Sequence, residues 1–274
     1  MGQHIGDSKM AEVFANMFNQ TMTIDSNYQQ SWKIEPMSQG TFFVQLEKEA
    51  TLINIDLEIK EGAQVKLFVF NRSEKDVDCH IAIHCEKDAH CQMGLLDMQQ
   101  TNFDWKQHVS LDQEGAQFSI QSAQLCTEGV KKMGDMEVLH NAGHTQGQMR
   151  NFAVLLDKGH YEMVANGNIK KACPDASSHQ ATRVLTLGKG HTAKCIPLLL
   201  IDENQVQASH ALTIGKPDED QLYYLQSRGL TTQQAIGLLS VGYFLPVIEM
   251  IDDQDLHDQV RQEMESKVGL YEQR

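Results

Sequence analysis

Short stretches in which apolar and polar residues alternate fill the chain from about residue 30 to residue 215. In residues 53–59, isoleucine or leucine occupies every second position, and Val206, Ala208 and His210 alternate with polar neighbours in the same way. A period of two residues is typical of a β-strand that buries one face. The chain is therefore predicted to be mainly β.

The turns between these strands resemble one another. The segment Glu61–Gln64 recurs as Glu114–Gln117, and Lys87–His90 occupies a comparable position between them. Gly159 and Gly190 lie 31 residues apart, and each follows a similar strand. Strand–turn–strand units recur roughly every 25 to 30 residues. Repeats of this length indicate a coiled stack of strands. They favour a parallel β-helix, with a β-sandwich as the alternative.

Helical spacing replaces strand spacing at both ends of the chain. Residues 8–19 carry apolar side chains at i, i+3, i+4, i+7 and i+8, which predicts an amphipathic helix capped by Ser8. This helix either packs on its own domain or docks on a partner. Three further helices are expected over residues 217–228, from a Thr231 cap onwards, and over residues 255–268. The predicted units are an N-terminal helix and lead-in (1–28), a β-helix core (29–215) and a C-terminal helical subdomain (216–274).

The charge balance narrows the range of partners. The chain of 274 residues has 23 Lys and Arg against 37 Asp and Glu, a net charge of −14. Nucleic acid and anionic membranes attract positive surfaces, so neither is an expected partner. Residues 1–20 lack the apolar core of a signal peptide, and the longest apolar segment, 235–248, is shorter than the roughly 20 residues of a spanning helix. We therefore expect a cytoplasmic protein whose six cysteines are reduced.

The last predicted strand and the helices after it carry a recognisable pattern. Residues 196–207 read IPLLLIDENQVQ, residues 208–215 read ASHALTIG, and residues 218–244 read DEDQLYYLQSRGLTTQQAIGLLSVGYF. These segments resemble the C-terminal signature of the SufB/SufD family of SUF-system iron–sulfur cluster assembly proteins. The resemblance implies a right-handed parallel β-helix core with C-terminal helices, and a non-catalytic scaffold role. The chain is most similar in pattern to a short SufD.

The resemblance gives His210 a candidate role. It matches the family's histidine at the SufB–SufD interface, where the nascent cluster or its iron is held, and neutral imidazole is a good iron ligand. Thr182 and Ala211 stand where SufB-type chains have a cysteine and a glutamate. No tightly bound cofactor is therefore expected, only transient iron or an iron–sulfur cluster at a subunit interface. The alternative is a structural histidine that hydrogen-bonds a neighbouring turn.

The resemblance also implies partners. In the family, an ABC-type ATPase, SufC, docks on the C-terminal helices, and the β-helices pair through their last strands, here about residues 198–215. We expect pairing with a SufB-like chain or with a second copy of this chain. The apolar side chains of the C-terminal helices would form the ATPase-docking surface, or alternatively they would all pack inside the protein. The candidate ATPase-docking residues are Tyr223, Tyr224, Leu225, Arg228 and Leu230.

A second group of possible ligands lies near the middle of the chain. Cys79, His84, Cys85 and Cys91 could hold a metal, which would make the protein a metallochaperone β-solenoid. Strand alternation, however, places the thiols on one face and the histidines on the other, which favours core packing. Cys173 is expected to be the most exposed thiol. A polysaccharide-acting β-helix enzyme is a further rival, but it would need an export signal and carboxylates or basic residues clustered on a groove face, and the sequence indicates neither.

Overall fold

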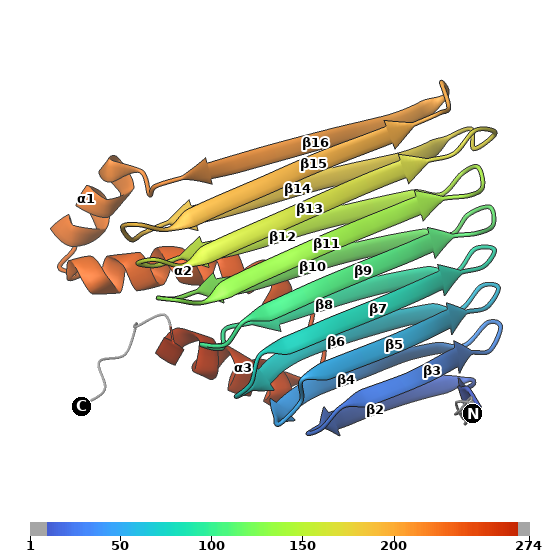
Figure 1. Ribbon diagram of the computed structural model, residues 1–274, viewed down its shortest axis with the longest axis horizontal. Helices are drawn as coiled ribbons and strands as arrows, with labels where there is room; N and C mark the ends of the chain where they lie inside the picture. Colours follow the sequence, from blue (N-terminus) through green and yellow to red (C-terminus); the bar gives the residue numbers. More distant parts are fainter. Residues whose placement is uncertain (1–9, 268–274) are drawn as a thin grey trace, which may run out of the picture.

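Strands from two sheets alternate along a single coil, and three helices follow the last strand (Figure 1). This computed structural model describes residues 10–267. The first sheet contains the odd-numbered strands β1 (Glu12–Phe14), β3 (Tyr28–Ile34), β5 (Leu52–Ile59), β7 (Val77–Cys85), β9 (Phe103–Leu111), β11 (Lys131–His140), β13 (His160–Ile169) and β15 (Thr192–Ile201). The second contains β2 (Met17–Ile24), β4 (Gln39–Lys48), β6 (Gln64–Ser73), β8 (His90–Asp97), β10 (Gln117–Cys126), β12 (Gln146–Leu155), β14 (Ala176–Thr186) and β16 (Val206–Gly215).

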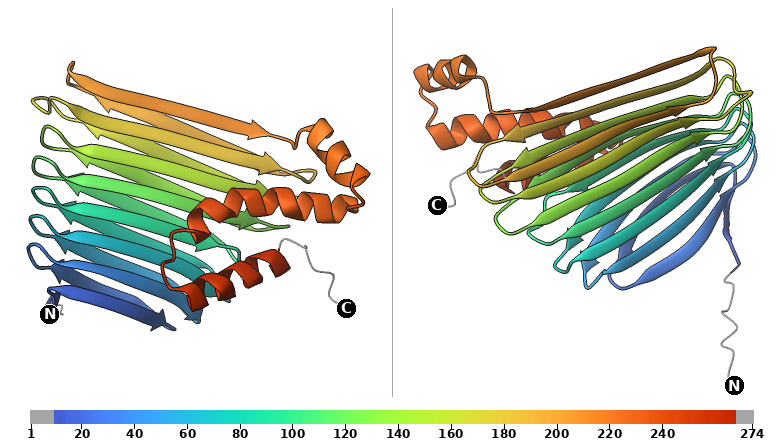
Figure 2. Two further views of the ribbon diagram at one scale, coloured as in Figure 1. Left: turned by 180° about the vertical axis from the view of Figure 1, so that it is seen from behind. Right: turned by 45° about the horizontal axis from the view of Figure 1, so that its top comes forward.

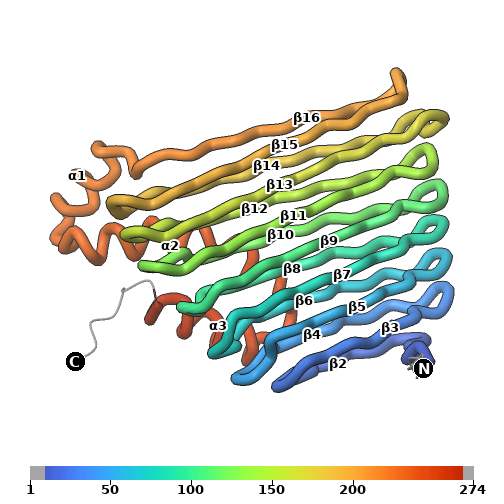
Figure 3. Tube along the Cα trace, viewed as in Figure 1, coloured from blue at the N-terminus to red at the C-terminus, as the bar shows by residue number. Residues whose placement is uncertain are grey.

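Neighbouring strands of each sheet are parallel and are separated by one full coil in the sequence, as the Cα trace in Figure 3 shows. β14 and β16, for example, pair in register from Ala176 with Val206 to Leu185 with Gly215. The predicted parallel β-helix is thereby confirmed. The alternative of a β-sandwich is wrong, because the strands of such a sandwich pair mainly antiparallel.

Recurring turns keep the coils in register. Gly62, Asp88 and Gly115 occupy equivalent turns 26 and 27 residues apart, and all have positive φ, of 67°, 54° and 75°. Glycine adopts this conformation without strain, and aspartate is among the residues that tolerate it. The amide of Gly62 donates to the carbonyl oxygen of Lys87 in the next turn at 2.9 Å, and the amide of Asp88 donates to that of Glu114 at 3.0 Å. The turns therefore stack in the same way as the strands.

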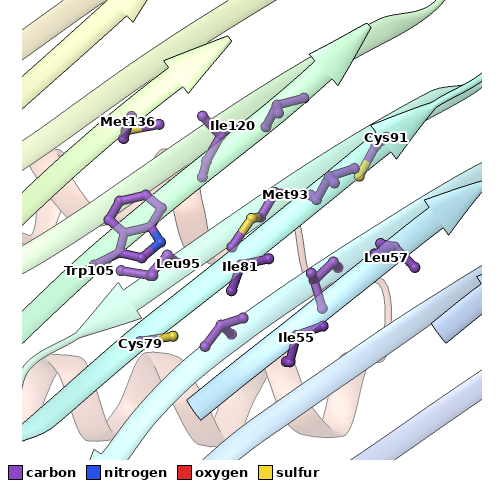
Figure 4. Packing of buried hydrophobic residues seen from close by; sticks show 14 of the residues in the cluster. Ile55, Leu57, Cys79, Ile81, Cys91, Met93, Leu95, Trp105, Ile120 and Met136 are labelled. Carbon is purple, nitrogen blue, oxygen red and sulfur yellow. The ribbon is translucent and has the colours of Figure 1, made fainter. Parts of the chain in front are cut away.

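The space between the two sheets is filled by the inward-facing side chain of every second residue. Figure 4 shows part of this core, in which Cys79, Cys91, Met93 and Trp105 lie among isoleucine and leucine side chains. Removing such apolar surface from water is the main favourable contribution to folding. The alternation read from the sequence therefore corresponds directly to the inside and outside of the coil.

The helix predicted over residues 8–19 is wrong. Ser8 lies outside the described residues, and the segment from Glu12 onwards forms β1 and β2, which pair with β3 and β4. Asn16, with φ of 61°, turns the chain between the two strands. Phe14 and Phe18 face inward from consecutive strands, so their helix-like spacing of four residues comes from a turn. The β core thus begins at Glu12 instead of residue 29.

The C-terminal subdomain contains the three expected helices, α1 (Glu219–Ser227), α2 (Thr232–Ile248) and α3 (Gln254–Lys267). Thr231 and Gln234 form the predicted capping box at the start of α2. α2 lies across β8, β10 and β12 on the outer face of the second sheet (Figure 2). A second core there joins Phe244 and Met264 of the helices to Phe70 and Leu96 of the strands. Within residues 10–267, none of the helices is long and apolar enough to span a membrane.

Candidate functional site

His210 lies at the end of a column of inward-facing residues. In-register neighbours in the second sheet share a face, so each column runs from coil to coil along the interior. The column begins and ends with polar residues, and its members from β4 to β12 are apolar. From the first coil to the last it contains Gln20, Phe42, Leu67, Met93, Ile120, Met149, Gln180 and His210.

The coil that carries His210 is open to solvent. β16 is the last strand of its sheet, so no further coil covers its inward-facing side chains. His210 is exposed, and its apolar neighbours Leu212 and Ile214 are 39% and 43% exposed. At the other end, the inward-facing Phe14 and Ile24 of the first strands are buried. The last coil therefore leaves its inward-facing side chains uncovered, whereas Phe14 and Ile24 are buried at the first coil.

Polar side chains occupy the interior just below this open end. Ser178, Gln180 and Thr182 face inward from β14 and are buried. The Nε2 atom of Gln180 donates to the carbonyl oxygen of Leu198 on β15 at 2.7 Å. The Oγ of Ser178 and the Oε1 of Gln180 are buried without a hydrogen-bond partner among the described residues. Buried polar groups are usually paired, so each of these two atoms calls for a partner.

The structure also places the two residues that stand at the family's ligand positions. Thr182 is buried inside the coil, where it pairs in register with Leu212. Ala211 pairs with Ala181 and shares the outer face of the sheet, away from His210. A methyl group and a hydroxyl cannot supply the thiolate and carboxylate of the pattern. Of these three positions, only His210 carries a ligand for iron.

The candidate docking residues divide into two sets. Tyr223 and Tyr224 are 73% and 55% exposed, and the guanidinium carbon of Arg228 lies 5.2 Å from the centre of the Tyr224 ring. Leu225 and Leu230 are half-buried. None of the residues of α1 is buried. Of the five candidates, the two tyrosines and Arg228 are therefore the exposed ones.

The cysteines and histidine near the middle of the chain do not converge. Cys79, Cys85 and Cys91 are buried in the core, and burial raises the pKa of each thiol, that of Cys91 to about 12. His84 faces outward, where its Nδ1 lies 3.5 Å from a carboxylate oxygen of Asp112. Among residues 10–267, no three His, Cys, Asp or Glu side chains are arranged to hold a metal ion. The geometry gives the metallochaperone alternative no support.

Two features were not anticipated. Cys173 is buried, contrary to the expectation that it is the most exposed thiol, and its Sγ donates to the carbonyl oxygen of His140 at 3.4 Å. Cys195, on the open last coil, is the half-buried one among the six. The proximity of Gln180 to His210 was also missed. The repeat length could have predicted this proximity. Gln180 precedes His210 by 30 residues, about one repeat, so the two residues occupy equivalent positions in adjacent coils.

A groove of about 980 Å³ crosses the outer face of the first sheet, remote from His210 in the fold. Asp56 of β5 and Asp135 and Glu137 of β11 lie along it, and β7 and β9 separate the first carboxylate from the other two. Oε2 of Glu137 lies 3.1 Å from Nδ1 of His108, and Oε1 accepts a hydrogen bond from the side-chain amide of Asn168 at 2.8 Å. These contacts stabilise the outer face between neighbouring strands.

Comparison with protein families matches residues 28–243 to the family described as SUF system FeS cluster assembly, SufBD core domain. The chain is similar to the iron–sulfur cluster assembly protein SufD of Bacillus subtilis, with 31% identity over 132 residues that cover 48% of this chain and 30% of that protein. The identity to SufD of Escherichia coli is 28% over 123 residues, which cover 44% of this chain and 29% of that protein. The identity to a SufBD family protein of Mycobacterium leprae is 28% over 167 residues, which cover 52% of this chain and 43% of that protein. The matches span less than half the length of each relative.

Proposed function

Because the chain belongs to the SufBD core family of SUF-system iron–sulfur cluster assembly proteins, we propose that it is a SufD-like scaffold subunit of that machinery in the cytoplasm. It carries out no reaction by itself. It pairs with another β-solenoid, holds an ATPase on its helices, and presents a ligand for iron or a nascent cluster at the seam. The observation that carries this proposal is the position of His210 on an uncovered last coil.

The open end suits pairing with a SufB-like chain or a second copy of this chain. β15 and β16 each end a sheet, so one edge of each strand has unpaired backbone donors and acceptors. Leu198, Leu200, Leu212 and Ile214 add exposed apolar side chains around these edges. Exposed apolar surface of this kind commonly marks a protein–protein interface. A partner that covers the last coil therefore buries both the strand edges and these side chains.

His210 would then face the seam between the two subunits. An imidazole contributes one ligand, and iron–sulfur clusters are held by several, usually cysteine thiolates. The remaining ligands must come from the partner, because Thr182 and Ala211 supply none. Iron or a cluster is in this view a transient cargo shared between subunits.

An ABC-type ATPase similar to SufC would dock on α1. The short link of residues 216–218 joins α1 directly to β16, the strand of His210. A movement of α1 imposed by the ATPase cycle would pull on the end of that strand. The cargo site and the ATPase would in this way be coupled through one continuous segment.

The solution mass of the chain tests this proposal. Light scattering is measured for the chain alone, with a SufC-type ATPase, and with a SufB-like chain from the same organism. We expect a stable pair that binds one ATPase per copy of this chain. A monomer that binds neither protein contradicts the proposed function.

Two variants locate the pairing surface. Leu212→Asp combined with Ile214→Asp introduces charge into the open end, so the pair is expected to become a monomer. Met17→Asp is the matched control, because Met17 is 85% exposed at the opposite end of the solenoid. If Met17→Asp abolishes pairing and the double variant does not, the subunits pair through the first coil.

A further inference from the structure

We propose that Gln180 positions the imidazole of His210 by accepting a hydrogen bond from one of its ring N–H groups. The inference rests on the cargo-site role of His210 proposed above, but it concerns the free chain as well. It makes Gln180 a positioning residue, which acts on the cargo only through the orientation of the ring.

The side-chain amide of Gln180 is held in one orientation. Its Nε2 donates to the carbonyl oxygen of Leu198 at 2.7 Å. A carbonyl oxygen only accepts hydrogen bonds, so the NH₂ group must be the one that faces Leu198. The Oε1 atom therefore points elsewhere. With Gln180 only 4% exposed, this oxygen is buried and has no donor among the described residues.

A buried acceptor without a donor is unfavourable by about 1–3 kcal/mol, so a partner at this place is expected. The two in-register neighbours of Gln180 in its column are Met149 on β12 and His210 on β16. Met149 has no N–H or O–H group to donate. His210 lies one strand spacing away, about 4.8 Å, on the same face of the sheet. The side chain of His210 has no hydrogen-bond partner among residues 10–267, and its ring N–H is a donor of the kind that Oε1 of Gln180 is missing.

The consequence for His210 is a fixed tautomer. A neutral imidazole has one N–H group and one lone pair, and the hydrogen bond of the first decides where the second is presented. When the N–H is donated inward to Gln180, the other ring nitrogen carries its lone pair towards the open end. This is the arrangement that a histidine ligand needs, and such supporting hydrogen bonds raise metal affinity in general.

The direct test is nitrogen NMR of the His210 ring in the full chain, which reports the tautomer without any metal. Gln180→Met keeps the length and flexibility of the side chain and removes its acceptor. We expect one tautomer to dominate in the natural chain and a mixture of both in Gln180→Met. Gln180→Glu keeps an oxygen acceptor beside the ring and should retain one dominant tautomer.

Gln148→Met is the matched control. Gln148 pairs in register with His179 on the outer face of the same two strands that carry Met149 and Gln180. This variant removes a glutamine beside a histidine but leaves the His210 column intact, so the His210 signals should not change. If Gln180→Met folds and shows the natural tautomer ratio, water or another group satisfies Oε1, and the inference is overturned.

Iron(II) titration of the assembled protein separates this inference from the proposed function. Loss of a supporting hydrogen bond typically weakens metal binding by about 10-fold to 100-fold, and we expect this loss in Gln180→Met. If the natural assembly binds no iron(II), the cargo-site proposal fails, while the tautomer measurement still decides the role of Gln180. If iron(II) binds equally well to the natural assembly and to Gln180→Met, the positioning role is refuted.

Discussion

The Nζ atom of Lys132 lies 2.7 Å from Oδ2 of Asp97, and both side chains are fully buried inside the solenoid. Lys132 also donates to the carbonyl oxygens of Gln99 and Thr101 at 3.0 and 2.7 Å. Oδ1 of Asp97 accepts from the side-chain amide of Asn71 at 3.0 Å. Additional hydrogen bonds of this kind offset part of the cost of removing two charges from water. The pair joins the last residue of β8 to β11, one and a half coils later.

Breaking this pair should destabilise the protein strongly. Lys132→Met leaves the Asp97 carboxylate buried without its counter-charge, which typically costs about 3–5 kcal/mol of unfolding free energy. The combined change Lys132→Met and Asp97→Asn removes both charges and should recover most of that loss. Urea unfolding followed by circular dichroism measures both values.

The control for this prediction is the exposed pair of Lys66 and Asp252, whose Nζ and Oδ2 atoms are 2.6 Å apart. Because both side chains are largely in water, Lys66→Met should cost less than about 1 kcal/mol. If Lys132→Met costs no more than Lys66→Met, the buried pair does not contribute to stability in the way inferred here.

The alternation of the sequence predicted the coil, but not its interior charges. Met136 and Val138 mark the inward-facing positions of β11, and Lys132 falls in the same phase. From the sequence alone, a lysine at an inward-facing position is interpreted as a surface residue. Its partner Asp97 lies 35 residues away, so local spacing does not reveal the ion pair. The N-terminal helix was misread for a related reason. Phe14 is buried by pairing with β3, a contact that local spacing does not contain.

A buried histidine should make stability depend on pH. His140 is fully buried, its Nδ1 lies 2.8 Å from the hydroxyl of Thr145, and burial lowers its pKa to about 4. The unfolded chain binds this proton near pH 6.5, so between pH 6.5 and 4 the unfolded state holds more protons. Stability is therefore complete above pH 6.5 and is lost as the pH falls through this window. The loss amounts to roughly 3 kcal/mol.

Comparison with His140→Gln isolates this contribution from the carboxylates that titrate nearby. The natural chain should lose roughly 3 kcal/mol more than His140→Gln between pH 6.5 and 4, as measured by urea unfolding at each pH. His179→Gln changes a histidine on the outer face of β14 and should follow the natural chain. Parallel curves for the natural chain and His140→Gln would show that His140 is protonated in the folded protein.

Thiol labelling should report on the open end. Cys195 is half-buried on the last coil, while the other five cysteines are buried, so Cys195 should react first with iodoacetamide in the unpaired chain. Burial raises the pKa of Cys195 to about 11. The rate should therefore rise steadily with pH through the neutral range, because the thiolate is the reactive form. Mass spectrometry of peptides identifies the labelled residue.

Two comparisons make the labelling result decisive. Cys195→Ser should remove the fast phase, whereas Cys173→Ser should leave it unchanged because Cys173 is buried. Pairing through the last coil should slow the labelling of Cys195. Equal rates in the paired and unpaired protein would mean that the partner covers another surface.

The candidate site was predictable as far as its sequence signature extends. His210 stands in a segment whose residues are contiguous, so the resemblance placed it directly on the last strand, but it lies in the middle of β16 and not at the strand end expected from the sequence. Gln180 acquires its relationship to His210 only from the parallel register of β14 and β16. The openness of the coil depends on β16 being the last strand in its sheet, which is a property of the whole topology.

The exposed surface of α1 should carry the ATPase contact. Tyr223→Asp combined with Tyr224→Asp replaces two exposed rings by charges and also removes the ring that Arg228 covers. Central aromatic residues of interfaces typically contribute about 2 kcal/mol or more, so the affinity for a SufC-type ATPase should fall by about 30-fold or more. Isothermal titration calorimetry measures it, and circular dichroism checks the fold. Met37→Asp, at a 75% exposed turn position between β3 and β4, should bind normally. Undiminished binding by the folded double variant would move the ATPase contact to α2 or α3.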